Sequence, residues 1–498
     1  MSTSLEQLRA RMGEQSDLRN AAQVLEWDQQ TMMPRNGAES RADVLSTLGR
    51  VAHEQFIAEE TGALLDAAAA ELNGDSDEND GAALVRVVRR DWNKARRVPP
   101  ELAAELAHGA SLGQEAWAKA RADNDFKAFA PYLERNLSLA RAYVDCFDEF
   151  ECRYDALLDD YDSQMTAAEV SRLFAELRSE LVPLIATVSE RQLDDSPIHG
   201  EFPIGQQRQL VAETVEQMGF NRAGWRMDDT VHPFATSFGR NDVRITTRWD
   251  ETYFASGLYG AMHECGHGLY EAGIAPELQR TPLANGASLT VHESQSRLWE
   301  NMVGRGRAYS GVLAPRVGRL FGTTIEPGAL YRAVNRVRPS FIRVEADEAT
   351  YGLHIVLRFE LEQELIEGRL AVADLPEAWN ARFKEYLGLD VPDDANGVLQ
   401  DVHWSAGLIG YFPTYALGNL VAGQLWARAH ADMSDLDDRI ADGELAPLRE
   451  WLREHVHRYG AKFTTAELLK RELGQPIAVA PFVSYLKRKL SDVYAVDL

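Results

Sequence analysis

Residues 263–267 read His-Glu-Cys-Gly-His. They lie within the stretch 253–273, whose sequence pattern predicts a helix. A spacing of four residues places His263 and His267 one turn apart on the same helix face. Two imidazoles in that arrangement can share one tetrahedral zinc ion. Glu264 lies slightly around the helix, where it can reach a water at the metal and act as a general base without being a ligand.

A simpler alternative is a pair of surface histidines beside a solvated glutamate, because this short motif also arises by chance in long helical proteins. Gly266 lowers helix propensity by up to about 1 kcal/mol relative to alanine. That cost is understandable where the backbone lies close to another element or to a substrate. The Cys265 side chain points away from the two histidines, and we expect it to be buried in the core. We expect Asp250 to cap this helix and Gly273 to end it.

A catalytic zinc needs a third protein ligand and an open fourth position. The stretch 288–302 also looks helical and carries Glu293, which is our first candidate for the third ligand. His292 is a rival, although its side chain points about 100° away from that of Glu293 on a helix. Glu300 is a weaker rival.

Helical periodicity also dominates the rest of the chain, most clearly at residues 4–27, 102–120, 137–158 and 166–190. Residues 226–249 differ, because they contain β-branched and aromatic residues with a short alternation, and they predict a small sheet with a hairpin near 239–242. The last helical stretch opens with Thr166 and Glu169, which have the spacing of a capping box. No repeat or long linker divides the sequence. We therefore predict a mainly α fold with a small β-sheet, as one domain over residues 1–498.

The composition limits the classes of partner and the compartment. The 498 residues include 52 Lys and Arg and 77 Asp and Glu, which gives a net charge of −25. So acidic a surface disfavours nucleic acids and anionic membranes. We find no secretory signal and no apolar run of the roughly 18 residues that a membrane span requires. Three cysteines in a chain this long argue for a reducing compartment, so we predict a cytoplasmic protein.

One acidic stretch could be interpreted as a calcium-binding loop. Asp75, Asp77, Asn79 and Asp80 lie close together. A helix-loop-helix calcium loop requires glycine at its sixth position and glutamate at its twelfth. Counted from Asp75, these positions hold Asp80 and Arg86. We therefore predict a solvated loop without a metal.

Several further motifs appear along the chain in a fixed order, and together they resemble one family. The motifs are LEWDQQTMMP at 25–34, HPF at 232–234, DVRIT at 242–246, HECGH at 263–267, HESQ at 292–295, IRVEAD at 342–347 and GVLQDVHW at 397–404. The sequence resembles the metallocarboxypeptidases typified by carboxypeptidase Taq. The resemblance covers nearly the whole chain.

The resemblance implies a fold and an activity that the spacing alone does not. The fold would be a helical saddle similar to neurolysin and angiotensin-converting enzyme, with two lobes flanking a deep groove. The activity would be removal of C-terminal amino acids from peptides with a free C-terminus, with broad specificity that spares proline. One zinc ion per chain is implied, for which cobalt can substitute. Members of the family are typically homodimers.

A carboxypeptidase must bind a free carboxylate at a fixed distance from its metal, and an arginine fork suits that task. Arg343 is our first candidate and Arg244 the second. From the sequence alone, surface salt bridges would be the better interpretation of both, and the motif resemblance is what favours Arg343. We expect Asp347 and Asp401 to orient neighbouring side chains.

The remaining candidates follow from analogy with related groove peptidases. His403 and a tyrosine, either Tyr411 or Tyr415, could donate to the oxyanion of the transition state. We favour Tyr415, and core packing is the alternative role for either tyrosine. His232 and Gln400 are predicted to line the substrate groove.

Two other functions compete with the carboxypeptidase. An oligoendopeptidase of the same fold class would share the metal residues but would not require Arg343. A non-catalytic, metal-stabilised peptide-binding protein would use the groove without cutting peptides. Glu264 would be unnecessary in such a protein, which counts against it.

Overall fold

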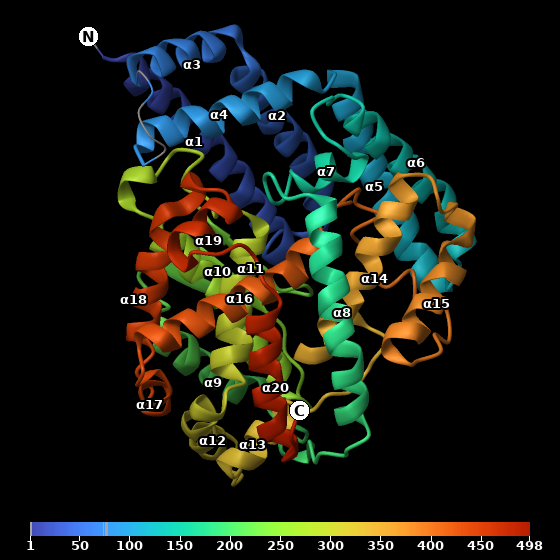
Figure 1. Ribbon diagram of the computed structural model, residues 1–498. Helices are drawn as coiled ribbons and strands as arrows, with labels where there is room; N and C mark the ends of the chain where they lie inside the picture. Colours follow the sequence, from blue (N-terminus) through green and yellow to red (C-terminus); the bar gives the residue numbers. More distant parts are fainter. Residues whose placement is uncertain (1, 73, 75–77) are drawn as a thin grey trace.

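The computed structural model describes residues 2–72, 74 and 78–498. It is mainly helical with a small β-sheet, so the predicted fold class is confirmed (Figure 1). Asp75 and Asp77 of the acidic stretch lie outside the described residues. Within the described ranges, no helix is both long and apolar enough to cross a membrane.

The first four helices form a layer at the top of the view in Figure 1. They are α1 (Ser4–Thr31), α2 (Ala38–Ile57), α3 (Glu59–Leu72) and α4 (Asp80–Arg97). This layer has a small hydrophobic core of its own, in which Leu8, Leu65 and Leu84 pack with Ile274 and Leu283 of a later segment. The N-terminal helices therefore meet the rest of the molecule along that segment.

The other helices build the main body around a much larger core. They are α5 (Pro100–Asp123), α6 (Phe126–Val144), α7 (Arg153–Leu158), α8 (Ala167–Ser189), α9 (Ile204–Met218), α10 (Phe254–Gly273), α11 (Leu289–Arg297), α12 (Arg307–Phe321), α13 (Pro327–Val334), α14 (Glu348–Ile366), α15 (Leu375–Leu387), α16 (Pro413–Asp432), α17 (Leu436–Ala441), α18 (Ala446–His455), α19 (Thr465–Leu473) and α20 (Ala480–Tyr494). Helix α11 packs against both α10 and α16 and continues into a π-helix, η4 (Leu298–Gly304). The single-domain organisation stays a prediction.

The small sheet supports one side of α10. Its strands are β1 (Trp225–Asp229), β2 (Ala235–Ser237) and β3 (Val243–Thr247), in the order β1-β3-β2. Strands β2 and β3 are antiparallel, and the Phe238 N–H donates to the Asp242 carbonyl, so the predicted hairpin is confirmed. The parallel pairing of β1 with β3 was not predicted. The Thr247 hydroxyl donates to the Gly257 carbonyl and ties β3 to α10.

Two predicted helix starts have different outcomes. The Thr166 hydroxyl accepts the Glu169 main-chain N–H at 3.2 Å and caps α8, as its spacing predicts. The prediction that Asp250 caps α10 is wrong, because α10 begins after Tyr253. The Asp250 carboxylate instead accepts the main-chain N–H and the hydroxyl of Thr252, which forms a turn before the helix.

The predicted continuous helix over residues 137–158 is also wrong. Helix α6 ends at Val144 and α7 begins at Arg153. Between them Phe147 is buried, and the Lys94 ammonium from α4 lies 5.5 Å from its ring centroid. The Asp155 carboxylate accepts the main-chain N–H groups of Cys152 and Ala167. The contacts of Phe147 with Lys94 and of Asp155 with Ala167, together with the local cap at Cys152, outweigh the helical periodicity.

Gly266 lies where α10 and α11 come closest. A Cβ atom at this position would stand 2.8 Å from the Gln295 carbonyl oxygen and 2.8 Å from the Ser296 Cα. Both are main-chain atoms of α11, which cannot rotate away. Cys265 beside it is fully buried, as predicted. Gly266 thus allows α10 and α11 to come close together. We expected such a contact because glycine lowers the helix propensity of the motif.

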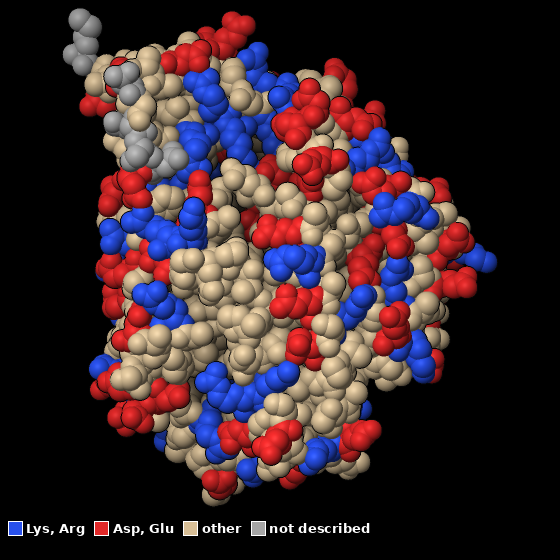
Figure 2. Space-filling view, viewed as in Figure 1, with Lys and Arg blue, Asp and Glu red and all other residues tan. Residues whose placement is uncertain are grey.

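The surface carries charges of both signs. Figure 2 shows Lys and Arg interspersed with Asp and Glu over the visible face, and an area around α16 and α20 with few charges. Many of the basic side chains on α4 are engaged with acidic neighbours, as Lys94 is with Asp159 and Asp160. On this face, charges of the two signs are therefore interspersed.

Gly266→Ala should separate α10 from α11 and destabilise the protein by about 1–3 kcal/mol, since overpacking has roughly that cost. Gly260→Ala is the matched control on the same helix, because its Cβ would meet only the Thr247 hydroxyl at 3.7 Å. That control should be neutral or stabilising by up to about 1 kcal/mol. Urea unfolding of both variants measures the difference. Equal effects would contradict the proposed close contact.

Candidate metal and catalytic site

Three side chains from α10 and α11 direct donor atoms at one point. The Glu293 Oε2 lies 3.6 Å from the His263 Nε2 and 3.5 Å from the His267 Nε2. The three donor atoms lie within 4.8 Å of one another. Ligands at the usual distance of about 2.0–2.1 Å around a tetrahedral zinc are roughly 3.3–3.5 Å apart. The spacing and the mixed nitrogen and oxygen donor set therefore fit a zinc ion.

The two rival ligands lie on the other side of the imidazole rings. The Glu300 carboxylate is 3.0 Å from the His263 Nδ1. The His292 Nδ1 is 2.6 Å from the His267 Nδ1, and the His292 Nε2 is 2.6 Å from Glu271. If the Nε2 of each ring faces a metal, its Nδ1 carries the proton, so His292 accepts from His267 and donates to Glu271. Both rivals then orient the ring next to them.

Burial and neighbouring charges determine the ionisation of the donor residues His267 and Glu293. Burial lowers the pKa of His267 to about 3, which keeps the ring neutral with a lone pair for a metal. Burial opposes ionisation of Glu293, but Arg297 and the two histidines outweigh it and hold its pKa below the ordinary value. The Arg297 Nε donates to Glu293 at 2.7 Å, and its Nη1 lies 3.4 Å from Glu300. Arg297 thus compensates the charge of both carboxylates.

Glu264 stands beside the donor group on α10. Its side chain is buried, and burial raises the pKa of its carboxyl to about 7. Its carboxylate makes no hydrogen bond to any other residue that the structure describes. A carboxylate without a protein partner is available to exchange a proton with a reacting group near neutral pH.

His403 and two tyrosines form an aromatic cluster. The His403 Nε2 lies 3.2 Å from the Tyr415 hydroxyl, and the Tyr411 and Tyr415 ring centroids are 5.3 Å apart. Burial lowers the pKa of His403 to about 3, and burial raises the pKa of Tyr411 to about 12, with a contribution from the Glu293 charge. All three are neutral donors or acceptors at ordinary pH, and Glu293 lies close enough to act on the tyrosines.

Arg343 is held beside the same cluster. Its Nε and Nη2 donate to the Asp401 Oδ1 at 3.0 and 2.8 Å, and its Nη1 donates to the Tyr351 hydroxyl at 2.9 Å. The guanidinium lies 5.0 Å from the Tyr415 ring centroid. The Gln400 side chain accepts the Arg343 main-chain N–H at 2.8 Å. Asp401 orients Arg343, in agreement with the role predicted for it.

Comparison with known proteins decides the family. A family model described as carboxypeptidase Taq (M32) metallopeptidase matches residues 7–490. The chain belongs to this family. It is 39% identical to thermostable carboxypeptidase 1 of Thermus thermophilus over 94% of each chain, and 35% identical to carboxypeptidase 1 of Bacillus subtilis over 95% of each. The crystal structure of the M32 carboxypeptidase of Deinococcus radiodurans matches with a TM-score of 0.94 at 39% identity, covering 99% of this chain and 100% of that one.

The family membership makes the protein a metallocarboxypeptidase, with a metal cofactor and peptides as substrates. Two predicted substrate residues are not joined to the donor group by any hydrogen bond or ring contact among the described residues. Arg244 pairs with Asp242 at 2.9 Å and lies over the Trp27 ring, and His232 is exposed in the segment before β2. Arg244 and His232 stay predictions.

Sequence reasoning missed several residues that hold this M32 site together. Glu271 supports His292, Arg297 bridges the two glutamates, and Tyr351 binds Arg343. Arg358 donates to the second oxygen of Asp401 at 2.5 Å. One signal was available, because Glu271 follows His267 by four residues and so shares its helix face.

Glu362 fixes the loop that carries His403. Its Oε1 accepts the Trp404 indole N–H at 2.7 Å, and its Oε2 accepts the Tyr154 hydroxyl at 2.6 Å and the Gly410 N–H at 3.1 Å. Burial raises the pKa of this carboxyl from 4.5 to about 7, against the effect of these donors. The folded protein therefore retains this proton at pH values where the unfolded chain releases it.

The sign of the resulting pH dependence follows from that raised pKa. Glu362 stabilises the fold fully below pH 4.5, and this contribution is lost as the pH rises through about 7. Glu362→Gln has no such titration, so its stability relative to wild type should rise by about 3 kcal/mol over this range. Urea unfolding from about pH 5 to pH 8 measures it. Glu367→Gln, at the exposed end of α14, should track the wild type. A pH-independent difference for Glu362→Gln would contradict the account.

Proposed function

We propose that this protein is a zinc-dependent carboxypeptidase that releases C-terminal amino acids from peptides with broad specificity and spares proline. One zinc ion per chain would be held by His263, His267 and Glu293, and cobalt could substitute for it. The observation that carries the proposal is the meeting of three donor atoms at 3.5 and 3.6 Å, which matches ligand spacing around tetrahedral zinc.

In the proposed reaction, Glu264 is the general base. Zinc, when bound, polarises the scissile carbonyl and lowers the pKa of water. Glu264 takes the proton from the attacking water and returns it to the leaving amine. Its buried position and a pKa of about 7 suit both transfers near neutral pH.

His403 and Tyr415 are proposed to donate to the oxyanion as it forms. A buried donor that strengthens its hydrogen bond in the transition state lowers the barrier most in a site that excludes water. The 3.2 Å contact between the His403 ring and the Tyr415 hydroxyl supports the choice of Tyr415 as the first candidate. Tyr411 packs against the same ring and stays the alternative, with a role in substrate binding.

Arg343 is proposed to bind the terminal carboxylate of the peptide. Asp401 is shared between Arg343 and Arg358, so two cations face one anion and the buried group keeps one uncompensated positive charge. An incoming carboxylate would neutralise that charge. Within the described part of the chain, the Arg343 Nη1 bonds to the neutral Tyr351 hydroxyl alone, and a carboxylate can replace that bond with a stronger charge-assisted one.

Other parts of the proposal rest on the sequence and the family resemblance. His232, Arg244 and Gln400 are proposed to line the groove. We also propose a cytoplasmic location, supported by three cysteines that form no disulfide among the described residues, and a homodimeric assembly.

Exopeptidase action can be tested with one set of peptides. Peptides with a free C-terminus should shorten one residue at a time, and C-terminal amidation should block the reaction. Arg343→Ala should lower kcat/KM on free peptides by about 100-fold or more, because a bond to a charged partner is lost and Asp401 loses part of its compensation. Mass spectrometry follows the products.

Arg172→Ala is the matched control, since Arg172 is an exposed arginine on α8 whose ion-pair partner among the described residues is Glu176 alone. It should behave as wild type. Internal cleavage of amidated peptides at equal rate, unaffected by Arg343→Ala, would instead indicate an oligoendopeptidase.

Glu264→Gln should retain bound metal and lower kcat by about 100-fold to 10,000-fold, because the amide cannot accept the proton. Metal analysis and peptide hydrolysis of the same preparation measure the two properties. Glu176→Gln, on the surface of α8, is the control and should keep both. Full activity of the Glu264→Gln variant would reject the proposed general base.

A further inference from the structure

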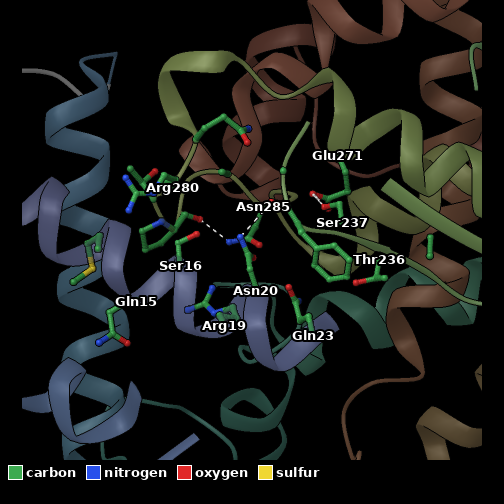
Figure 3. Close-up of a pocket in the computed structure, with 18 of the residues that line it drawn as sticks. Gln15, Ser16, Arg19, Asn20, Gln23, Thr236, Ser237, Glu271, Arg280 and Asn285 are labelled. Carbon is green, nitrogen blue, oxygen red and sulfur yellow. Dashed lines mark hydrogen bonds between the residues drawn. The ribbon is translucent and has the colours of Figure 1, made fainter. Parts of the chain in front are cut away.

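Each imidazole of the proposed metal site is supported from behind, and the two supports come from different parts of the molecule. Behind His267, a chain of hydrogen bonds ends at the small sheet, where the Ser237 hydroxyl donates to Glu271 at 3.1 Å (Figure 3). Behind His263 stands the Glu300 carboxylate, which belongs to the π-helix η4. The support of His263 therefore depends on what holds η4 in place.

The Asn301 carbonyl near the end of η4 accepts hydrogen bonds from side chains. The Arg305 N–H, which follows Asn301 by four residues, bonds to the Glu300 carbonyl instead. The next N–H, that of Gly306, bonds to the Val303 carbonyl. Asn301 is buried, and a buried carbonyl needs a donor because it has given up its bonds to water.

Lys489 of α20 supplies such a donor from a buried position. Its Nζ donates to the Asn301 carbonyl at 3.1 Å and to the Glu348 Oε2 at 2.7 Å. It also donates to the Tyr485 hydroxyl, one turn earlier on α20, at 3.0 Å. An ammonium group has three protons, and these three acceptors use all of them. Lys489 thereby joins α20 to η4 and to the first residue of α14.

The charges of the Lys489–Glu348 pair also suit the two helix ends that the pair connects. The ammonium lies at the C-terminal end of η4, where main-chain carbonyls carry partial negative charge. The Glu348 carboxylate lies in the first turn of α14, where main-chain N–H groups carry partial positive charge. Within the described residues, the Glu348 Oε1 has no hydrogen-bond partner. Loss of Lys489 alone would therefore leave a buried carboxylate without its ion-pair partner.

We propose that Lys489 is a positioning residue of the metal site, because its bond to the Asn301 carbonyl holds η4 where Glu300 meets His263. Asn301 directly follows Glu300, so a shift of the Asn301 carbonyl moves the main chain that carries the Glu300 side chain. In the described chain, Lys489 bonds to none of the proposed ligands, and its effect passes through Glu300. The inference rests on the proposed zinc site.

The first test compares two double variants that each remove one ion pair. Lys489→Met/Glu348→Gln removes the donor together with the charge of its partner, so no unpaired charge stays in the core. It should weaken zinc binding by about threefold to tenfold, less than the loss of a residue that touches a metal ligand, because Lys489 acts one step further away. Lys487→Met/Glu180→Gln makes the same change at a partly exposed pair of α20 and should bind zinc as wild type does. Competition with a chromophoric chelator measures the zinc affinity.

A second test separates positioning of Glu300 from a general loosening of the fold. In a Glu300→Gln background, the Lys489→Met/Glu348→Gln change should have little further effect on zinc affinity, because the two changes act on the same contact. The visible absorption spectrum of the cobalt-loaded protein should also shift in the Lys489→Met/Glu348→Gln variant and stay unchanged in the Lys487→Met/Glu180→Gln control. Lost stability alone would lower the urea midpoint without changing either property.

Unchanged zinc affinity and cobalt spectrum in the folded Lys489→Met/Glu348→Gln variant would overturn the inference and leave the proposed function intact. An equally large effect in the Glu300→Gln background would also overturn it. Should this variant fail to fold, Tyr485→Phe takes its place, since it removes one acceptor of Lys489 and should weaken zinc binding by about twofold. Unchanged affinity in Tyr485→Phe would then overturn the inference. Wild type that bound no zinc, or bound it equally well after His263→Ala, would reject the proposed function and the inference together.

Discussion

The contact between α10 and α11 at Gly266 is the constraint on which the site depends. Main-chain atoms of α11 lie 2.8 Å from the position that a Cβ atom at residue 266 would take, too close for any larger residue. Gly418 of α16 makes a similar approach to Glu293 from the opposite side, with a Cβ position 2.7 Å from that of the glutamate. Glu293 is thus confined between two helices, and its carboxylate is brought to both imidazoles.

This arrangement largely buries the charged side chains of Glu293 and Glu300, and nearby arginines compensate both charges. Arg297 lies between Glu293 and Glu300, while Arg305 donates to the other oxygen of Glu300. The π-helix η4 carries Glu300 at the point where it meets His263, and helices with this wider turn often occur at functional sites. Breaking one member of such a network leaves an unpaired charge in the interior, so its residues are strongly coupled.

Local sequence patterns predicted the parts of the molecule that depend on near neighbours. The four-residue spacing placed His263 and His267 on one face, and the alternation near 242–248 located the hairpin. The break between α6 and α7 was missed because a contact with Lys94 of the distant α4 contributes to it, whereas the start of α10 was missed although the Asp250–Thr252 turn before it is local. The second partner of Asp401 was also missed, since Arg358 reaches it only after the chain has folded, and Glu271 was missed as the partner of His292 although its spacing from His267 was a usable signal.

Anomalous X-ray diffraction at the zinc edge tests the central claim most directly. The account predicts one peak per chain within about 2.0–2.2 Å of the His263 Nε2, the His267 Nε2 and a Glu293 oxygen. A peak coordinated by His292 or Glu300, with the Glu293 side chain turned away from it, would contradict the account.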